Sequence, residues 1–122
     1  MKTHKLSFGS ISLLKVNLAE VVINEGVVMD SKMVEEYHAF FIEKLEAPFS
    51  LLINKKHSYT YTFEAQKTIA NIGLVKAMAV VTYAYVSQLA TDVLINVNRD
   101  NDWNIKMFKS REDALKWLEN QS

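Results

Sequence analysis

The stretch Trp103–Leu118, WNIKMFKSREDALKWL, is the most diagnostic part of the sequence. It begins with an alternation that is typical of a strand, in which Trp103, Ile105 and Met107 share one side. Ser110 follows as a helix cap, with acidic residues behind it that favour the positive end of a helix. Apolar residues then recur at helical spacing up to Leu118. A strand that leads into a terminal amphipathic helix indicates the end of an α/β domain.

The rest of the chain alternates between strand and helix patterns with few glycines or prolines. Strands are predicted at residues 4–8, 11–18, 21–23, 49–53 and 75–82, and the segment 27–29 is either loop or strand. Gly9-Ser10 is expected to form a hairpin turn, and residues 99–102 a polar turn. Helices are predicted from Asp30 or Ser31 to near Ala47, from Thr62 to Gly73, and over residues 86–97.

These elements follow the order β-β-β-α-β-α-β-α-β-α. The prediction is an α/β fold near the α+β border, with a mixed sheet, four helices and a single domain over residues 1–122. The first strands form the antiparallel part, and right-handed βαβ units form the parallel part.

Composition excludes several classes of protein. Lys plus Arg equals Asp plus Glu at 14 each, so the chain lacks the basic surplus typical of nucleic-acid binders. It has no cysteine, which excludes disulfides and thiolate sites and fits a cytoplasmic location. No apolar stretch is long enough for membrane insertion. His4, His38 and His57 share no metal-ligand spacing, and we expect no metal, cofactor or catalytic centre.

The segment Met107–Leu118, MFKSREDALKWL, together with the element order, resembles STAS domains, the anti-anti-sigma-factor-like proteins grouped with the STAS/SEC14 fold. The resemblance implies a small stand-alone bacterial regulator. In that family a kinase phosphorylates a serine in an Asp-Ser-Ser-Gly-type loop after a central strand. Here Thr62 lies near that position, but Tyr61 replaces the acid and no glycine follows. The phosphoacceptor motif is missing.

Candidate binding residues lie in two segments that follow the central strands, where ligands of open α/β sheets bind. The first segment holds Lys55, Lys56, His57, Ser58, Tyr59, Thr60, Tyr61 and Thr62, and the second holds Tyr83 and Tyr85. Thr62 is expected to be a helix cap, with phosphorylation at Ser58, Thr60 or Thr62 as the alternative. Tyr59, Tyr61 and Phe63 are expected to pack on the domain, with an exposed partner-binding loop as the alternative.

Three further expectations concern the basic cluster and the function. Lys55, Lys56 and His57 are expected to form a solvated loop. The alternative is that they point inward and strengthen an anion site at the helix start near Thr62. The predicted function is a non-enzymatic regulatory or protein-interaction module, whose partner is another protein or a second copy in a homodimer. The alternative is a small-molecule or lipid-binding module, with an apolar pocket between the third helix and the sheet near Tyr83, Tyr85, Val86 and Leu89. That pocket is absent if Phe40, Phe41, Phe49, Phe63 and Met78 fill the interior.

Overall fold

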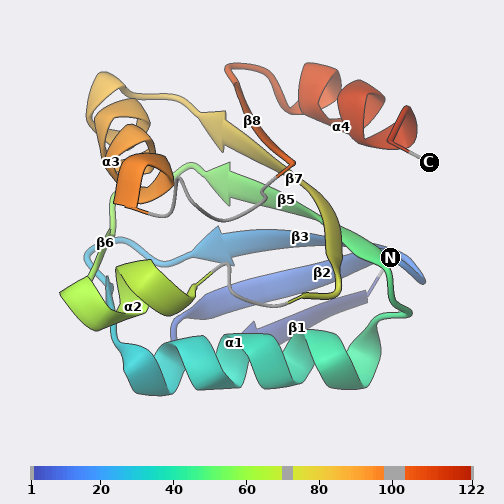
Figure 1. Cartoon of the computed structure of the whole chain (residues 1–122), viewed down its shortest axis with the longest axis horizontal. Helices are drawn as coiled ribbons and strands as arrows, with labels where there is room; N and C mark the ends of the chain where they lie inside the picture. The colour runs from blue at the N-terminus through green and yellow to red at the C-terminus, as the bar shows by residue number, and fades with distance from the viewer. Residues whose placement is uncertain (1, 70–72, 98–103, 122) are drawn as a thin grey trace.

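A mixed sheet forms the centre of the molecule, with helices on both faces (Figure 1). The computed structural model describes residues 2–69, 73–97 and 104–121, without the side chains at positions 86, 87, 90, 94 and 97. Within these residues the main sheet has the strand order β1–β2–β3–β5–β7–β8. Its strands are β1 (Lys2–Leu6), β2 (Gly9–Lys15), β3 (Leu18–Ile23), β5 (Phe49–Lys55), β7 (Val75–Thr82) and β8 (Ile105–Phe108).

Neighbouring strands among β1, β2 and β3 pair antiparallel, and β3, β5, β7 and β8 run parallel to one another. The predicted mixed α/β sheet with an antiparallel N-terminal part is therefore confirmed. A second, two-stranded sheet pairs β4 (Val28–Met29) with β6 (Thr60–Tyr61). Val28–Met29 is thus a strand, which was one of the two readings of that segment, whereas β6 was not predicted.

The predicted turn at Gly9-Ser10 is wrong. Gly9 opens β2, and the turn lies at residues 7 and 8. Glycine is needed there because a Cβ atom at position 9 would collide with the carbonyl oxygen of Val22. The second predicted strand is also too long, since β2 ends at Lys15 and Leu18 already belongs to β3.

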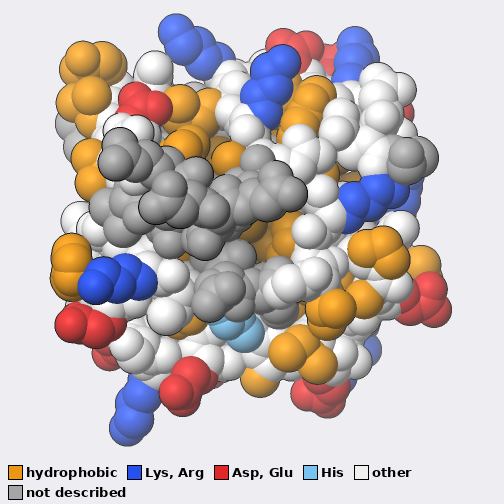
Figure 2. All heavy atoms as spheres, in the orientation of Figure 1, with side chains coloured by type: hydrophobic (Ala, Val, Ile, Leu, Met, Phe, Trp, Pro, Cys, Tyr) orange, Lys and Arg blue, Asp and Glu red, His pale blue; other side chains and the backbone are white. Residues whose placement is uncertain are grey.

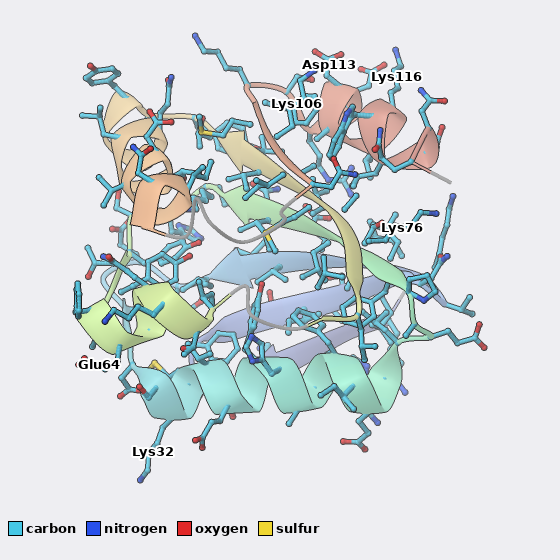
Figure 3. All side chains as sticks on the ribbon, in the orientation of Figure 1. Lys32, Glu64, Lys76, Lys106, Asp113 and Lys116 are labelled. Carbon is cyan, nitrogen blue, oxygen red and sulfur yellow. The ribbon has the colours of Figure 1, made fainter. Side chains whose placement is uncertain are left out.

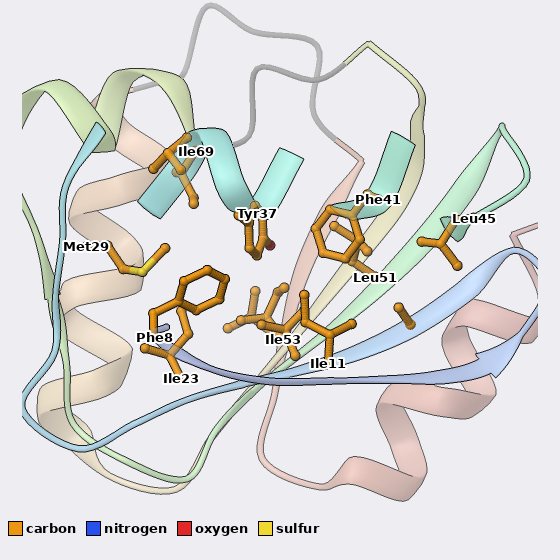
Figure 4. Packing of buried hydrophobic residues seen from close by; sticks show 14 of the residues in the cluster. Phe8, Ile11, Ile23, Met29, Tyr37, Phe41, Leu45, Leu51, Ile53 and Ile69 are labelled. Atoms are coloured by element: carbon orange, nitrogen blue, oxygen red, sulfur yellow. The ribbon is translucent and has the colours of Figure 1, made fainter. Parts of the chain in front are cut away.

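Helices α1 (Ser31–Lys44) and α2 (Phe63–Thr68) pack on one face of the sheet. Asp30 caps α1 by accepting a hydrogen bond from the Met33 amide at 2.9 Å. Tyr37 and Phe41 point from α1 into the core, as Figure 4 shows, and both are buried. α1 ends before the predicted Ala47.

Thr62 caps α2, as predicted, and its Oγ1 accepts a hydrogen bond from the Ala65 amide at 3.2 Å. α2 is nevertheless shorter than predicted. The C-cap of α2 is Ile69, so Gly73 lies beyond the helix and does not close it, and the predicted helical position Ile72 lies outside the described residues.

Helix α3 (Tyr85–Val97) follows β7 and contributes the fully buried Thr91 to the same side of the sheet as α1. Helix α4 (Arg111–Glu119) covers the opposite face with Ala114 and Leu118. Ser110 caps α4 as predicted, because its Oγ accepts from the Asp113 amide at 3.3 Å. Trp103 and the polar turn predicted at residues 99–102 lie outside the described residues.

Most of the large residues whose packing would rule out the apolar pocket lie in the interior. Phe41 and Phe49 are buried, and Phe40 and Met78 pack against the same core. Phe63 is the exception, since it is 61% exposed at the start of α2, where the Lys67 ammonium lies 4.3 Å from its ring centroid.

Candidate functional site

The carboxyl ends of β5 and β7 lie side by side, with Lys55 paired to Thr82 in the parallel register. The two predicted binding segments therefore start at the same end of the sheet, as expected. They do not form one surface, however. Lys55, Tyr59 and Tyr61 point inward and line a cavity. Tyr83, just before α3, and Tyr85, the first residue of α3, face outward.

Lys55 is buried, with 5% of its surface exposed, so its prediction as part of a solvated loop is wrong. Side chains alternate along a strand, and Phe49, Leu51 and Ile53 of β5 all belong to the core beneath α1. Lys55 continues this row by one more position. The charged side chains labelled on the helices in Figure 3, such as Lys32 and Lys116, point outward instead.

The ammonium group of Lys55 lies against two tyrosine rings. Its Nζ is 5.1 Å from the ring centroid of Tyr59 and 5.6 Å from that of Tyr61, which is within range of cation–π attraction. Among the described residues no carboxylate forms an ion pair with it. Burial lowers the pKa of Lys55 from its ordinary 10.5 to about 8, because a low-dielectric environment disfavours the charged form.

The same environment acts on the tyrosines. Burial raises the pKa of Tyr61 to about 12 and raises the pKa values of Tyr37 and Tyr59 further above their ordinary range. The Tyr61 hydroxyl donates a hydrogen bond to the Tyr59 hydroxyl at 3.2 Å. The rings of Tyr59 and Tyr61 pack against the core, as predicted. The prediction is wrong for Phe63, which is 61% exposed.

A cavity of about 20 Å³ adjoins Lys55 between α1, α3 and the sheet. Its wall is mostly apolar and includes Ile53, Val80 and Ile105, and the hydroxyl-bearing residues Tyr37 and Thr91 line it as well. This volume accommodates about one water molecule. The residues proposed for an apolar pocket do not line it, because Tyr83, Tyr85 and Leu89 are exposed, and the Val86 side chain lies outside the described residues.

The rest of the first segment is tied to the turn before α1. Lys56, Ser58 and Thr60 are exposed and His57 is partly buried. The Gly26 amide donates to the Ser58 carbonyl at 2.8 Å, and the amides of Thr60 and Thr62 donate to the carbonyls of residues 27 and 29. These bonds fix the backbone of the segment and pair β6 with β4. Phosphorylation at Ser58, Thr60 or Thr62 stays a prediction.

The outer face of α3 carries an uninterrupted apolar row. Tyr85, Leu89 and Val93 follow one another at a spacing of four residues and are 72%, 46% and 51% exposed. Tyr83, just before the helix, is 56% exposed. Asp92 is the single charged residue in the sequence of α3. Figure 2 shows hydrophobic side chains gathered at the left edge of the view, over α3 and α2. We call Tyr83, Tyr85, Leu89 and Val93 the α3 face.

The other side of the sheet holds a polar network that is structural in character. Arg111 of α4 makes two hydrogen bonds to the carboxylate of Glu20, at 2.8 and 3.0 Å, and the Asn54 amide adds a third at 2.8 Å. Burial alone would raise the pKa of Glu20, but these bonds and the charge of Arg111 outweigh it and lower the pKa. The network fastens α4 to β3 and β5.

Two other features are absent from the described residues, 2–69, 73–97 and 104–121. These residues hold no group of three or more His, Asp or Glu side chains placed to bind a metal ion. Nor do they contain a helix whose length and apolar character would let it cross a membrane.

Comparison with known proteins places the chain in a family. Residues 14–122 match the family model described as "Domain of unknown function (DUF7793)". The chain belongs to this family. No curated protein matches the sequence.

A solved structure agrees with the architecture. The chain is similar to an uncharacterised protein of the DUF3478 family from Shewanella loihica PV-4, which has a SpoIIAA-like fold. The similarity covers 97% of each chain with a TM-score of 0.59 and 16% identity. At this identity the match establishes the fold, and it confirms the predicted STAS-like architecture.

Proposed function

We propose that this chain is a non-enzymatic regulatory module that acts by binding protein, and that the α3 face meets a second copy of the chain. The observation that carries the proposal is the apolar row of the α3 face, with Tyr85, Leu89 and Val93 exposed to solvent at a spacing of four residues. Burying large apolar side chains is the main driving force of protein association. A row at this spacing forms a ridge that packs into the matching groove of another helix.

The chemistry of α3 favours a second copy over a charged partner. The four side chains of the α3 face carry no formal charge, so two α3 faces would meet without like-charge repulsion between the face residues. The formal charge of the whole chain is zero, and long-range repulsion between two copies is therefore small. Tyr83 and Tyr85 are the kind of aromatic anchor that interfaces favour.

The cavity beside Lys55 bears on the alternative, a lipid or metabolite carrier. A volume of about 20 Å³ is far below the roughly 300 Å³ or more of a drug-sized ligand site. A ligand of that size therefore does not fit this cavity, and the exposed row of the α3 face supports protein binding instead. We also place the chain in the cytoplasm, with which its lack of cysteine agrees.

The test compares variants in sedimentation velocity runs over a range of concentrations. Leu89→Lys introduces a charge into the middle of the α3 face, and Ile42→Lys introduces the same charge at an apolar position of α1 that is 61% exposed. We expect dimers for the unaltered chain and for Ile42→Lys, and monomers for Leu89→Lys. Circular dichroism checks that both variants fold.

Two results would overturn the proposal. The first is an unaltered chain that stays monomeric at the highest concentration, and the second is equal dissociation of both variants. The second result would mean that any surface charge disturbs association, so that the α3 face has no special part in it.

A further inference from the structure

The most unusual group in the described structure is a buried ammonium without an acidic partner. Lys55 is 5% exposed, and its Nζ lies over the rings of Tyr59 and Tyr61. Buried charges in proteins are as a rule paired, because an unpaired charge loses its hydration without compensation. Cation–π contacts replace only part of that hydration.

The titratable groups that face Lys55 from the described residues do not compensate its charge. Tyr37 faces the cavity from α1, and Tyr59 and Tyr61 face it from β6 and the residues before it. All three have raised pKa values and stay neutral near pH 7. The described lining residues of β3, β5, β7, β8 and α3 include no carboxylate.

We propose that the cavity beside Lys55 binds a small monovalent anion, a halide or an anion of similar size, against the Lys55 ammonium. One negative charge neutralises the charge of Lys55, whereas a divalent anion would leave a net charge in an apolar cavity. The cavity volume of about 20 Å³ fits an occupant about as large as a water molecule and excludes sulfate or a phosphate ester.

A second donor is available beside the ammonium. The Tyr61 hydroxyl donates to the Tyr59 hydroxyl, so the hydrogen of Tyr59 is free to point to another acceptor. Tyr59 lines the same cavity as Lys55. The apolar walls favour weakly hydrated anions such as bromide, because these lose less hydration energy on entering an apolar site. This site is independent of the α3 face.

The experiment uses sodium bromide as the probe and sodium sulfate of equal ionic strength as the reference. The pKa of Lys55 is followed by nuclear magnetic resonance of the side-chain nitrogen in both salts. We expect saturable bromide binding and a higher Lys55 pKa in bromide, since a bound anion favours the charged amine. Crystals soaked in bromide should show an anomalous scattering peak beside Nζ.

Lys55→Met and Lys56→Met form a matched pair, since Lys56 is exposed at the next position. Lys55→Met should weaken bromide binding by about tenfold or more, as expected for loss of a charged hydrogen-bond donor, and Lys56→Met should leave it unchanged. An equal pKa in both salts, or a water molecule alone in the bromide-soaked cavity, would overturn the proposal. Equal binding by both variants would also overturn it, because it would mean adventitious surface binding.

Discussion

Replacing Lys55 by methionine should make the protein more stable at pH 7. The replacement keeps an unbranched side chain of similar length in the core and removes the buried charge. The difference between a pKa of 10.5 and one of about 8 corresponds to about 3 kcal/mol, since each tenfold change in proton affinity is worth about 1.4 kcal/mol. Losing the contacts with Tyr59 and Tyr61 costs about 1 kcal/mol. The expected net gain is about 2 kcal/mol in sulfate buffer.

The pH dependence gives the same prediction a second readout. Because the folded-state pKa of Lys55 is lowered, the unfolded chain binds more protons than the folded chain between pH 8 and 10.5. The free energy of unfolding of the unaltered chain should therefore rise with pH through this window. Relative to Lys55→Met, it should rise by about 2 kcal/mol between pH 7 and 9.5.

Urea denaturation at both pH values measures these differences, with Lys56→Met as the control. Other groups titrate alike in both chains, so they cancel in the comparison. If Lys55→Met is less stable at pH 7, or if its advantage is the same at pH 7 and 9.5, the account of a buried, uncompensated ammonium is wrong.

Three further substitutions test other parts of the structure. Arg111→Gln should lower the free energy of unfolding by about 2 kcal/mol, as measured by urea titration. It should also weaken the dependence of that free energy on pH below 4.5, as measured by acid titration, because the lowered pKa of Glu20 supplies stability that is lost on acidification. Gly9→Ala should cost about 3 kcal/mol or more in urea denaturation, since its new methyl group would collide with the Val22 carbonyl. Thr62→Ala should cost about 1 kcal/mol of thermal stability by removing the cap of α2, and Thr62→Asp should restore most of it.

Each of these has a result that contradicts it. An Arg111→Gln variant with an unchanged acid transition would mean that the pKa of Glu20 does not depend on Arg111. A Gly9→Ala variant as stable as the parent would show that β2 and β3 can separate without cost. If the chains with threonine, alanine and aspartate at position 62 are equally stable, the Thr62 side chain does not stabilise α2 as a cap.

The sequence predicted those parts of the fold that local patterns control. The caps at Thr62 and Ser110, the buried strand from Phe49 and the final strand and helix all follow from spacing and capping chemistry. Gly9 was misassigned because it serves a close approach between strands that are paired in space, and a turn glycine looks the same in sequence.

The candidate site was predicted less completely. The alternation of Phe49, Leu51 and Ile53 points position 55 toward the core. The predicted strand stopped at Ile53, whereas β5 continues to Lys55, so the longer strand would have identified a buried lysine. The exposed row on α3 could not be separated from a core-facing row, because both consist of apolar residues at helical spacing. Which side of an apolar helix faces the sheet is set by tertiary packing, here through Thr91.

The central claim, that two copies meet through the α3 face, is tested most directly by photo-crosslinking. A benzophenone amino acid at position 89 is compared with one at position 42, in a mixture of ¹⁵N-labelled and unlabelled chains, so that mass spectrometry separates crosslinks between copies from those within one copy. We predict crosslinks between copies from position 89 into residues 83–97, and few from position 42. Crosslinks from position 42 as frequent as those from 89, or none between copies from 89, would contradict the account.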